Sequence, residues 1–174
     1  MKKLQLPLSK EEIAQLKAGD GVLLSGTIYT ARDAAHKRLF EMMEKGQPLP
    51  IDLKDAIIYY VGPTPAKEGE AIGSAGPTTS SRMDPYTPAF IARGMQGMIG
   101  KGRRSDQVKE AIQKYQAVYF VTVGGAGALL SNAITKREMV PFEDLLAEAI
   151  TKLTIQDFPC YVGIDIYGND IYDD

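Results

Sequence analysis

The residues from 73 to 86, GSAGPTTSSRMDPY, carry side chains that could do chemistry in an unusual setting. Thr78 and Thr79 bring hydroxyls that donate and accept hydrogen bonds, and Arg82 brings a planar guanidinium suited to a carboxylate or a phosphate. The glycines and prolines around them favour a constrained turn. The stretch is therefore predicted to be an anion-binding loop. The alternative is an ordinary turn in which Asp84 caps the next helix.

Two further cations stand where an anion could bind. Arg32 directly follows a predicted strand and begins a predicted helix, where backbone N–H groups and the helix dipole attract negative charge. A basic residue works against that dipole, so Arg32 is either tolerated on the surface or placed there for a bound anion. Lys101 lies between two glycines in GMIGKGRR (97–104), on a predicted turn that a ligand can approach closely.

These cations and hydroxyls, if their loops converge, predict a site for a small dianion such as a dicarboxylate, held at both ends by charge-assisted hydrogen bonds. No acid, base or metal set accompanies them, so the residues alone predict half of a site. Asp33 and His36 have the i, i+3 spacing of a helix-surface pair. For His36, the only histidine, a structural role is favoured over a functional one.

Two glycine-rich stretches invite nucleotide-binding interpretations that their residues do not support. For GMIGKGRR to be a phosphate-binding loop, Met95 would have to be glycine, and Gly102 stands where a Ser or Thr should bind magnesium. In VGGAGALL (123–130), Leu130 replaces the third glycine of a dinucleotide motif, so close packing of a strand on a helix is favoured.

Composition excludes several classes of protein. The 174 residues carry a formal net charge of −2, which argues against a nucleic-acid partner. There is no apolar run of about 18 residues that could span a membrane, and the N-terminus lacks the apolar stretch of a signal peptide, so a cytoplasmic location is expected. Cys160 is the only cysteine, which excludes an internal disulfide and a cysteine-rich metal site within this chain.

The elements that must position these side chains alternate between strands and helices, and no linker divides them. This order predicts one α/β domain over residues 1–174, with a mixed sheet covered by helices. A capping box at Ser9 and Glu12 predicts the first helix start, and Thr30 is the expected N-cap of the second helix. The predicted strands are 21–29, 56–62, 117–125 and 160–168. The predicted helices are 8–20, 30–46, 87–94, 105–116, 126–134 and 141–153.

Several blocks of the sequence resemble a known family. They are SGTIYTARDAAHKRL, IYYVGPTPA, IGSAGPTTSSRMD, GMIGKG, VYFVTVGGAGALL and DFPCYVGIDIYGND, which run in order from about residue 19 to 170. They are similar to the beta subunit, or C-terminal domain, of the iron-sulfur hydro-lyases, which comprise class I fumarase and L(+)-tartrate dehydratase. The resemblance implies a swivelling β/β/α domain that acts on a small dicarboxylate.

The same resemblance implies a partner. In this family a separate alpha subunit carries the cysteines that bind a 4Fe-4S cluster, which agrees with a chain whose lone Cys160 cannot supply several thiolates. Homo-dimerisation within a hetero-oligomer is also implied by the resemblance. No metal ligand is expected in this chain, and neither nucleic acid nor a membrane is an expected partner.

The resemblance also implies roles for particular residues. Thr78 matches the proposed catalytic base of the family, and Arg32, Arg82 and Lys101 match positions that hold the substrate's carboxylates. A threonine hydroxyl is a very weak acid, so Arg32 and Lys101 are expected to be catalytic as well, by favouring the alkoxide. Thr79 is expected to bind substrate.

Asp33 and His36 match the RDAAH block of the family and are expected to orient Arg32 and the helix start. The favoured function is the beta subunit of a class I fumarate hydratase, which is inactive alone and hydrates fumarate reversibly to L-malate with its partner. One alternative is the beta subunit of an L(+)-tartrate dehydratase, which forms oxaloacetate from tartrate. The other is a non-catalytic module for anion binding or assembly.

Overall fold

The structure is a computed structural model of the chain, and it describes residues 1–61, 79–122, 127–140 and 150–173. The strands in these ranges form one mixed sheet in the order β1-β2-β3-β4-β5-β7-β6, which confirms the α/β class. The strands are β1 (Lys2–Gln5), β2 (Gly21–Thr30), β3 (Ile57–Tyr59), β4 (Gly97–Gly100), β5 (Val118–Val121), β6 (Ile134–Met139) and β7 (Thr151–Ile164).

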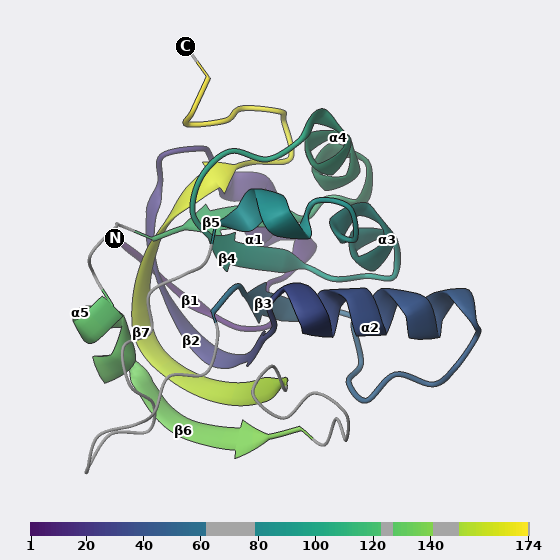
Figure 1. The fold of residues 1–174 in the computed structure, drawn as a ribbon. Helices are drawn as coiled ribbons and strands as arrows, with labels where there is room; N and C mark the ends of the chain where they lie inside the picture. Colours follow the sequence, from purple (N-terminus) through teal and green to yellow (C-terminus); the bar gives the residue numbers. More distant parts are fainter. Residues whose placement is uncertain (62–78, 123–126, 141–149, 174) are drawn as a thin grey trace.

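The sheet closes on itself. Strands β2, β3, β4 and β5 are parallel neighbours, and β7 pairs antiparallel with both β5 and β2. Strands β1 and β6 lie outside this ring, on β2 and β7 respectively. Figure 1 shows β2 and β7 as long curved strands that run side by side around one part of the molecule.

Helices α2, α3 and α4 cover the outside of this ring, whereas the buried residues of α1 and α5 join the core inside it. Figure 1 shows α2, α3 and α4 along one side of the sheet, away from the curve of β7. The helices are α1 (Lys10–Gln15), α2 (Asp33–Glu44), α3 (Thr87–Ala92), α4 (Asp106–Tyr115) and α5 (Gly127–Asn132), with a 3-10 turn η1 (Ser80–Met83) before α3. The capping box predicted at Ser9 is present, because its hydroxyl accepts from the Glu12 N–H and the Glu12 carboxylate accepts from the Ser9 N–H, both at 3.0 Å.

Alternation along each central strand builds two cores. In β3, Ile57 and Tyr59 pack inside the closed sheet, whereas Ile58 and the following Tyr60 pack under the helices. Because successive side chains of a strand point to opposite faces, one short strand supplies both cores. Strands covered on both faces read as continuous apolar runs, and this explains why IIYY is recognisable in the sequence as a buried strand.

Because the two cores cover both faces of the parallel strands, a ligand can approach these strands only at their ends. The pairing register sets Thr30 beside Tyr59, Tyr59 beside Ile99 and Ile99 beside Phe120. The carboxyl ends of four parallel strands therefore lie in one row. Ligands of parallel α/β sheets bind outside this edge, and the segments that leave it here include those that carry Arg32 and Lys101.

Several sequence-based element predictions need correction. GMIG was expected to be part of a flexible turn, but it is the buried strand β4, and β1 and β6 were not predicted. Most of the helix predicted at 141–153 lies outside the described residues, and its last three residues, Thr151–Leu153, belong to β7. None of the three missed strands is longer than six residues, so each carries too little local pattern to be recognised in the sequence. Pairing with neighbouring strands decides their conformation. Among the described residues, no helix has both the length and the apolar character that crossing a membrane requires.

Candidate active site

The start of α2 carries the first candidate cation. Arg32 is the N-cap residue of α2, and its side chain makes no capping hydrogen bond. The prediction that Thr30 caps this helix is wrong, because Thr30 is the buried last residue of β2. A backbone hydrogen bond of 3.1 Å from the Ala31 N–H to the Tyr59 carbonyl oxygen ties this transition to β3. The first turn of α2 therefore begins at the edge where the parallel strands end.

His36 supports this helix start from inside the protein. Its side chain is completely buried, so it is not the surface partner of Asp33 that the spacing suggested. His36 Nδ1 lies 2.8 Å from the Arg32 carbonyl oxygen. A carbonyl can only accept, so Nδ1 carries the proton and Nε2 the lone pair. The ring stacks on Phe90 at 5.3 Å and meets Tyr60 edge-on at the same distance.

Burial lowers the pKa of His36 to about 4, against an ordinary value of 6.5. The Arg32 carbonyl and the Asp33 carboxylate oppose this shift, and the Arg104 charge adds to it. Burial dominates because the imidazolium would lose its hydration among aromatic rings. His36 is therefore neutral in the folded protein at neutral pH and serves as a fixed donor to the Arg32 backbone.

This pKa predicts an acid-dependent loss of stability. The unfolded chain protonates His36 near pH 6.5, but the folded chain does so only near pH 4, so acidification favours unfolding between these values. We expect the free energy of unfolding to fall by about 3 kcal/mol from this group as the pH drops from 6.5 to 4. Urea titrations of the wild type and His36→Gln across this range measure it. Equal pH slopes in the two proteins would contradict a neutral buried imidazole.

The 3-10 turn η1 brings a second cation to the start of α2. Arg82 Nη2 lies 2.6 Å from a carboxylate oxygen of Asp33, the first residue of α2. Both side chains are substantially exposed, so water and ligands can still reach the guanidinium. This ion pair places Arg82 beside the helix start that carries Arg32, although the two arginines lie 50 positions apart in the sequence.

The segment just before η1 joins the turn after β4. Thr79 forms an isolated parallel bridge with Lys101, and the Ser80 N–H donates to the Lys101 carbonyl oxygen at 3.0 Å. Both Thr79 and Lys101 have exposed side chains. A glycine is required at position 100, since a Cβ there would stand 2.0 Å from Ser80 Oγ. The structure therefore brings together Thr79 with Lys101, and Arg82 with Asp33, through one short turn.

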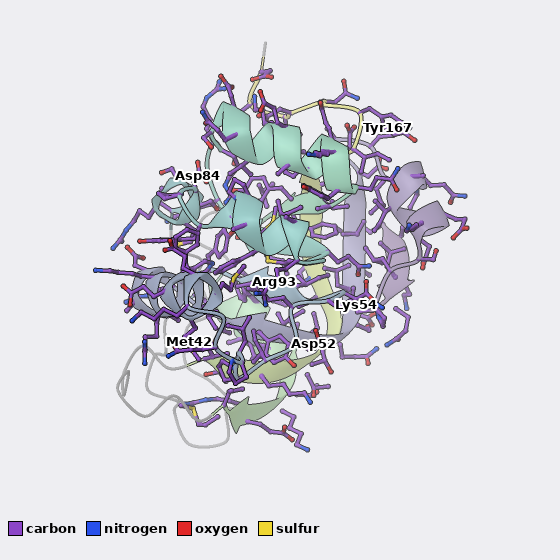
Figure 2. The ribbon with its side chains drawn as sticks, turned by 90° about the vertical axis from the view of Figure 1, so that its right-hand side faces the viewer. Met42, Asp52, Lys54, Asp84, Arg93 and Tyr167 are labelled. Atoms are coloured by element: carbon purple, nitrogen blue, oxygen red, sulfur yellow. The ribbon has the colours of Figure 1, made fainter. Side chains whose placement is uncertain are left out.

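A buried arginine that the sequence did not point to anchors the end of η1 through Asp84. Arg104 is fully buried, and its Nε donates to Asp84 at 2.7 Å. Its Nη2 donates to the Tyr60 and Thr87 hydroxyls, each at 3.0 Å. Figure 2 shows Asp84 near the helices on the side of the molecule opposite Tyr167. The only sequence signal was a second arginine after Lys101, in GKGRR, and charge alone does not predict burial.

These contacts correct the interpretation of Asp84 as a helix cap for α3. The N-cap of α3 is Tyr86, which makes no side-chain capping bond. Asp84 instead accepts from Arg104 and, at 2.7 Å, from the Ser105 N–H that precedes α4. Burial by itself would lower the pKa of Arg104, but Tyr60, Asp84 and Tyr119 together raise it above its ordinary value. Arg104 therefore stays charged in the core.

Two of the candidate segments lie outside the described residues. Thr78, the expected base, is in the range 62–78, and most of the VGGAG motif is in 123–126. Each range follows the end of a parallel strand, β3 and β5 respectively. Thr78 is covalently joined to Thr79, which the structure does place beside Lys101.

The thiol of this chain is not available as a ligand. Cys160 is buried on β7 inside the closed sheet, and burial raises the pKa of its thiol. Within the parts of the chain that the structure describes, no group of three or more His, Cys, Asp or Glu side chains could hold a metal ion. The described residues thus do not fit an iron-sulfur cluster. Their donor set of guanidinium, ammonium and hydroxyl groups fits the carboxylates of an anionic ligand.

The fold and the site define an α/β protein with a closed mixed sheet and a cationic candidate site at the carboxyl edge of its parallel strands. A sequence model of the family described as Fumarase C-terminus matches residues 1–174. The chain belongs to this family.

Named relatives cover nearly all of the chain. It is 40% identical over 173 residues to fumarate hydratase 2 of Leishmania major, with 97% of this chain and 30% of the relative covered. It is 42% identical to the aerobic class I fumarate hydratase of Escherichia coli K12, covering 94% of this chain and 31% of that protein. The chain thus spans about a third of the length of the curated fumarate hydratases that it matches.

A shorter relative matches over most of its own length. This protein of Methanocaldococcus jannaschii, provisionally named L(+)-tartrate dehydratase subunit beta, is 38% identical over 173 residues. The match covers 96% of this chain and 89% of the relative. The same domain is therefore similar both to part of long fumarate hydratases and to nearly all of a protein named as a subunit.

Proposed function

We propose that this chain is the beta-type part of a class I fumarate hydratase, which adds water reversibly to fumarate to give L-malate. The observation that carries the proposal is the backbone bridge between Thr79 and Lys101 at the end of β4. The turn that follows Thr79 carries Arg82, which forms an ion pair with Asp33 at the start of α2. Family membership supports the reaction class. The match to a relative that is itself named as a subunit beta supports a division of the enzyme into two parts.

The cations of this site bind the two carboxylates of the substrate. Arg32, at the start of α2, and Arg82, which its ion pair with Asp33 holds beside that helix start, take one carboxylate by charge-assisted hydrogen bonds. The N–H groups of the first turn of α2, which the Arg32 side chain does not cap, favour the same negative charge. Lys101 neutralises charge at the reacting end, and the Thr79 hydroxyl donates to the substrate beside it.

Thr78 acts as the base in the proposed reaction. In the direction of malate dehydration, its Oγ takes a proton from the carbon next to the one that loses the hydroxyl, and it returns that proton during hydration. Lys101 and Arg32 make this possible by stabilising the alkoxide and the negative charge that spreads onto the neighbouring carboxylate. Asp33 and His36 orient Arg32 and the helix start. Asp33 follows Arg32 in the chain and pairs with Arg82, and His36 donates to the Arg32 carbonyl oxygen.

The reaction requires a partner, because the described residues of this chain do not fit a cluster. An alpha subunit would bind the 4Fe-4S cluster with its own cysteines, and the cluster would act as a Lewis acid on the substrate hydroxyl. The chain alone is then inactive. In this proposal the domain swivels against the alpha subunit in the cytoplasm, and the beta chains form a homo-dimer within the hetero-oligomer.

One observation favours L(+)-tartrate dehydratase as a second candidate. A relative named as its beta subunit is 38% identical to this chain over 173 residues, which is close to the identity of the fumarate hydratases. Tartrate is also a dicarboxylate that carries hydroxyl groups, so the same cations fit it. A non-catalytic module that binds an anion or supports assembly is the remaining alternative.

Reconstitution separates these proposals. The chain is produced together with a candidate alpha subunit that carries the cluster cysteines, and is treated anaerobically with iron and sulfide, and then fumarate, malate and tartrate are each assayed. Interconversion of fumarate and malate supports the favoured function, whereas formation of oxaloacetate from tartrate supports the second. A cluster-containing complex that acts on none of the three contradicts both enzymatic functions and favours the non-catalytic module.

Replacing Lys101 with Met tests its catalytic role. We expect kcat to fall by about 10²-fold, the scale for losing one preorganised electrostatic group, while KM changes much less. The reason is that Lys101 stabilises charge that develops only in the transition state. Lys114→Met, at the far end of α4, is the matched control and should leave both constants unchanged. A change confined to KM would make Lys101 a binding group only.

A further inference from the structure

Lys101 and Gly102 form the turn after β4, and each of their backbone N–H and carbonyl groups has a hydrogen-bond partner. The Lys101 N–H donates to Ser80 Oγ and the Lys101 carbonyl oxygen accepts from the Ser80 N–H, each at 3.0 Å. The Gly102 N–H donates to the Tyr172 hydroxyl oxygen at 3.0 Å, and the Gly102 carbonyl oxygen accepts from the Tyr119 hydroxyl at 2.8 Å. The backbone of these two residues therefore cannot shift without losing a hydrogen bond.

The three residues that hold this turn come from distant parts of the chain. Ser80 begins η1, Tyr119 lies on β5, and Tyr172 lies in the segment after β7. The Tyr119 and Ser80 hydroxyl oxygens are also 2.7 Å apart, so the two supports are linked. We name Ser80, Tyr119 and Tyr172 the backbone cradle. The side chain of Lys101, in contrast to its backbone, is exposed.

We propose that the backbone cradle positions the Lys101 ammonium for catalysis, with Ser80, Tyr119 and Tyr172 as positioning residues that act through the turn. This inference rests on the proposed function of Lys101. A lysine side chain has four flexible carbons, so its ammonium is placed accurately only where its Cα is fixed. A misplacement of about 1 Å in an active site can lower the rate by about 10²-fold, so the cradle is expected to affect turnover without contacting the substrate.

Tyr172 offers the cleanest way to test the cradle. Its segment is anchored independently of the hydroxyl, because Lys109 Nζ lies 2.9 Å from Asp170 and 3.2 Å from Asp173. Arg103 also donates to the Tyr172 carbonyl oxygen. Tyr172→Phe therefore removes one hydrogen bond to the turn and leaves the segment attached. Tyr119→Phe removes the support on the other side of Gly102.

A matched control exists in the same C-terminal segment. The Tyr167 hydroxyl donates to a backbone carbonyl oxygen, that of Ala14, at 2.7 Å. Figure 2 shows Tyr167 on the other side of the molecule from Asp84, the residue that anchors the end of η1. Tyr167→Phe therefore deletes a tyrosine hydroxyl and its backbone hydrogen bond without touching the cradle.

The experiment compares these variants in two backgrounds of the reconstituted two-chain enzyme. We expect Tyr172→Phe and Tyr119→Phe each to lower kcat by about tenfold with little change in KM, and Tyr167→Phe to leave both unchanged. In a Lys101→Met background, Tyr172→Phe and Tyr119→Phe should cause no further loss, because the group they position is absent. Losses that multiply in both backgrounds would overturn the inference, since they indicate a general structural effect.

A second measurement does not depend on activity. Hydrogen exchange of the Gly102 amide in the assembled protein should accelerate in Tyr172→Phe, while helix amides of α4 keep their protection. Unchanged exchange at Gly102 would overturn the cradle. A wild-type complex that acts on none of the dicarboxylates would count against the proposed function instead. In that case, slow exchange at Gly102 that depends on Tyr172 would still support the cradle as a positioning device for Lys101.

Discussion

Replacing Thr78 with Ala is expected to lower kcat for fumarate hydration by about 10²- to 10⁴-fold, the range that a positioned general base contributes. In the proposed reaction the variant loses the oxygen that takes the substrate proton. Assembly with the partner subunit should be unaffected, because the change is small and removes no charged group. Steady-state kinetics of the reconstituted enzyme and size-exclusion chromatography measure the two effects.

Two further variants decide whether the hydroxyl is responsible. Thr78→Ser keeps the oxygen and should recover most of the activity. Ser81→Ala removes an exposed hydroxyl from η1, three positions further along the chain, and should leave kcat unchanged. Near-normal turnover in an assembled Thr78→Ala enzyme would move the base to another residue. An equal loss in Thr78→Ser would mean that the methyl group, and not the oxygen, matters.

Replacing Asp84 with Ala is expected to destabilise the folded protein by about 3–5 kcal/mol, the usual cost of leaving a buried charge without its partner. Arg104 has no exposed side-chain surface and would keep only neutral hydroxyl partners and the rings of Tyr60 and Tyr119, which lie 5.1 and 4.7 Å from its guanidinium. The loss is a large part of the roughly 5–15 kcal/mol that stabilises a typical domain. Urea denaturation measures it as a lower midpoint at an unchanged slope.

The controls separate the buried charge from the lost carboxylate. Glu138→Ala removes an acid from the exposed ion pair with Lys136 and should not change the midpoint measurably. Combining Asp84→Ala with Arg104→Met should give a more stable protein than Asp84→Ala alone, because the uncompensated charge is removed. A double variant that is less stable than Asp84→Ala would contradict this explanation and indicate that Arg104 contributes mainly by packing.

Local patterns in the sequence were sufficient for elements whose signals are local. The capping box at Ser9, the apolar run IIYY of β3 and the helix α4 after Ser105 were all predicted, and the structure confirms them. Strand β4 was missed, because GMIG carries two glycines that favour turns. Its conformation comes from pairing with β3 and β5, and Gly100 is needed for the close approach of Ser80.

The sequence by itself determined which chemical groups are available: arginines, a lysine and hydroxyls that suit a dicarboxylate, with one cysteine. Only the tertiary structure decided which of them meet. Arg82 pairs with Asp33, and Arg104 is buried against Asp84, twenty positions away. Ser80, Tyr119 and Tyr172 converge on one turn. These contacts depend on the register of a closed sheet that joins distant segments, and no periodicity or spacing within a short window records that register.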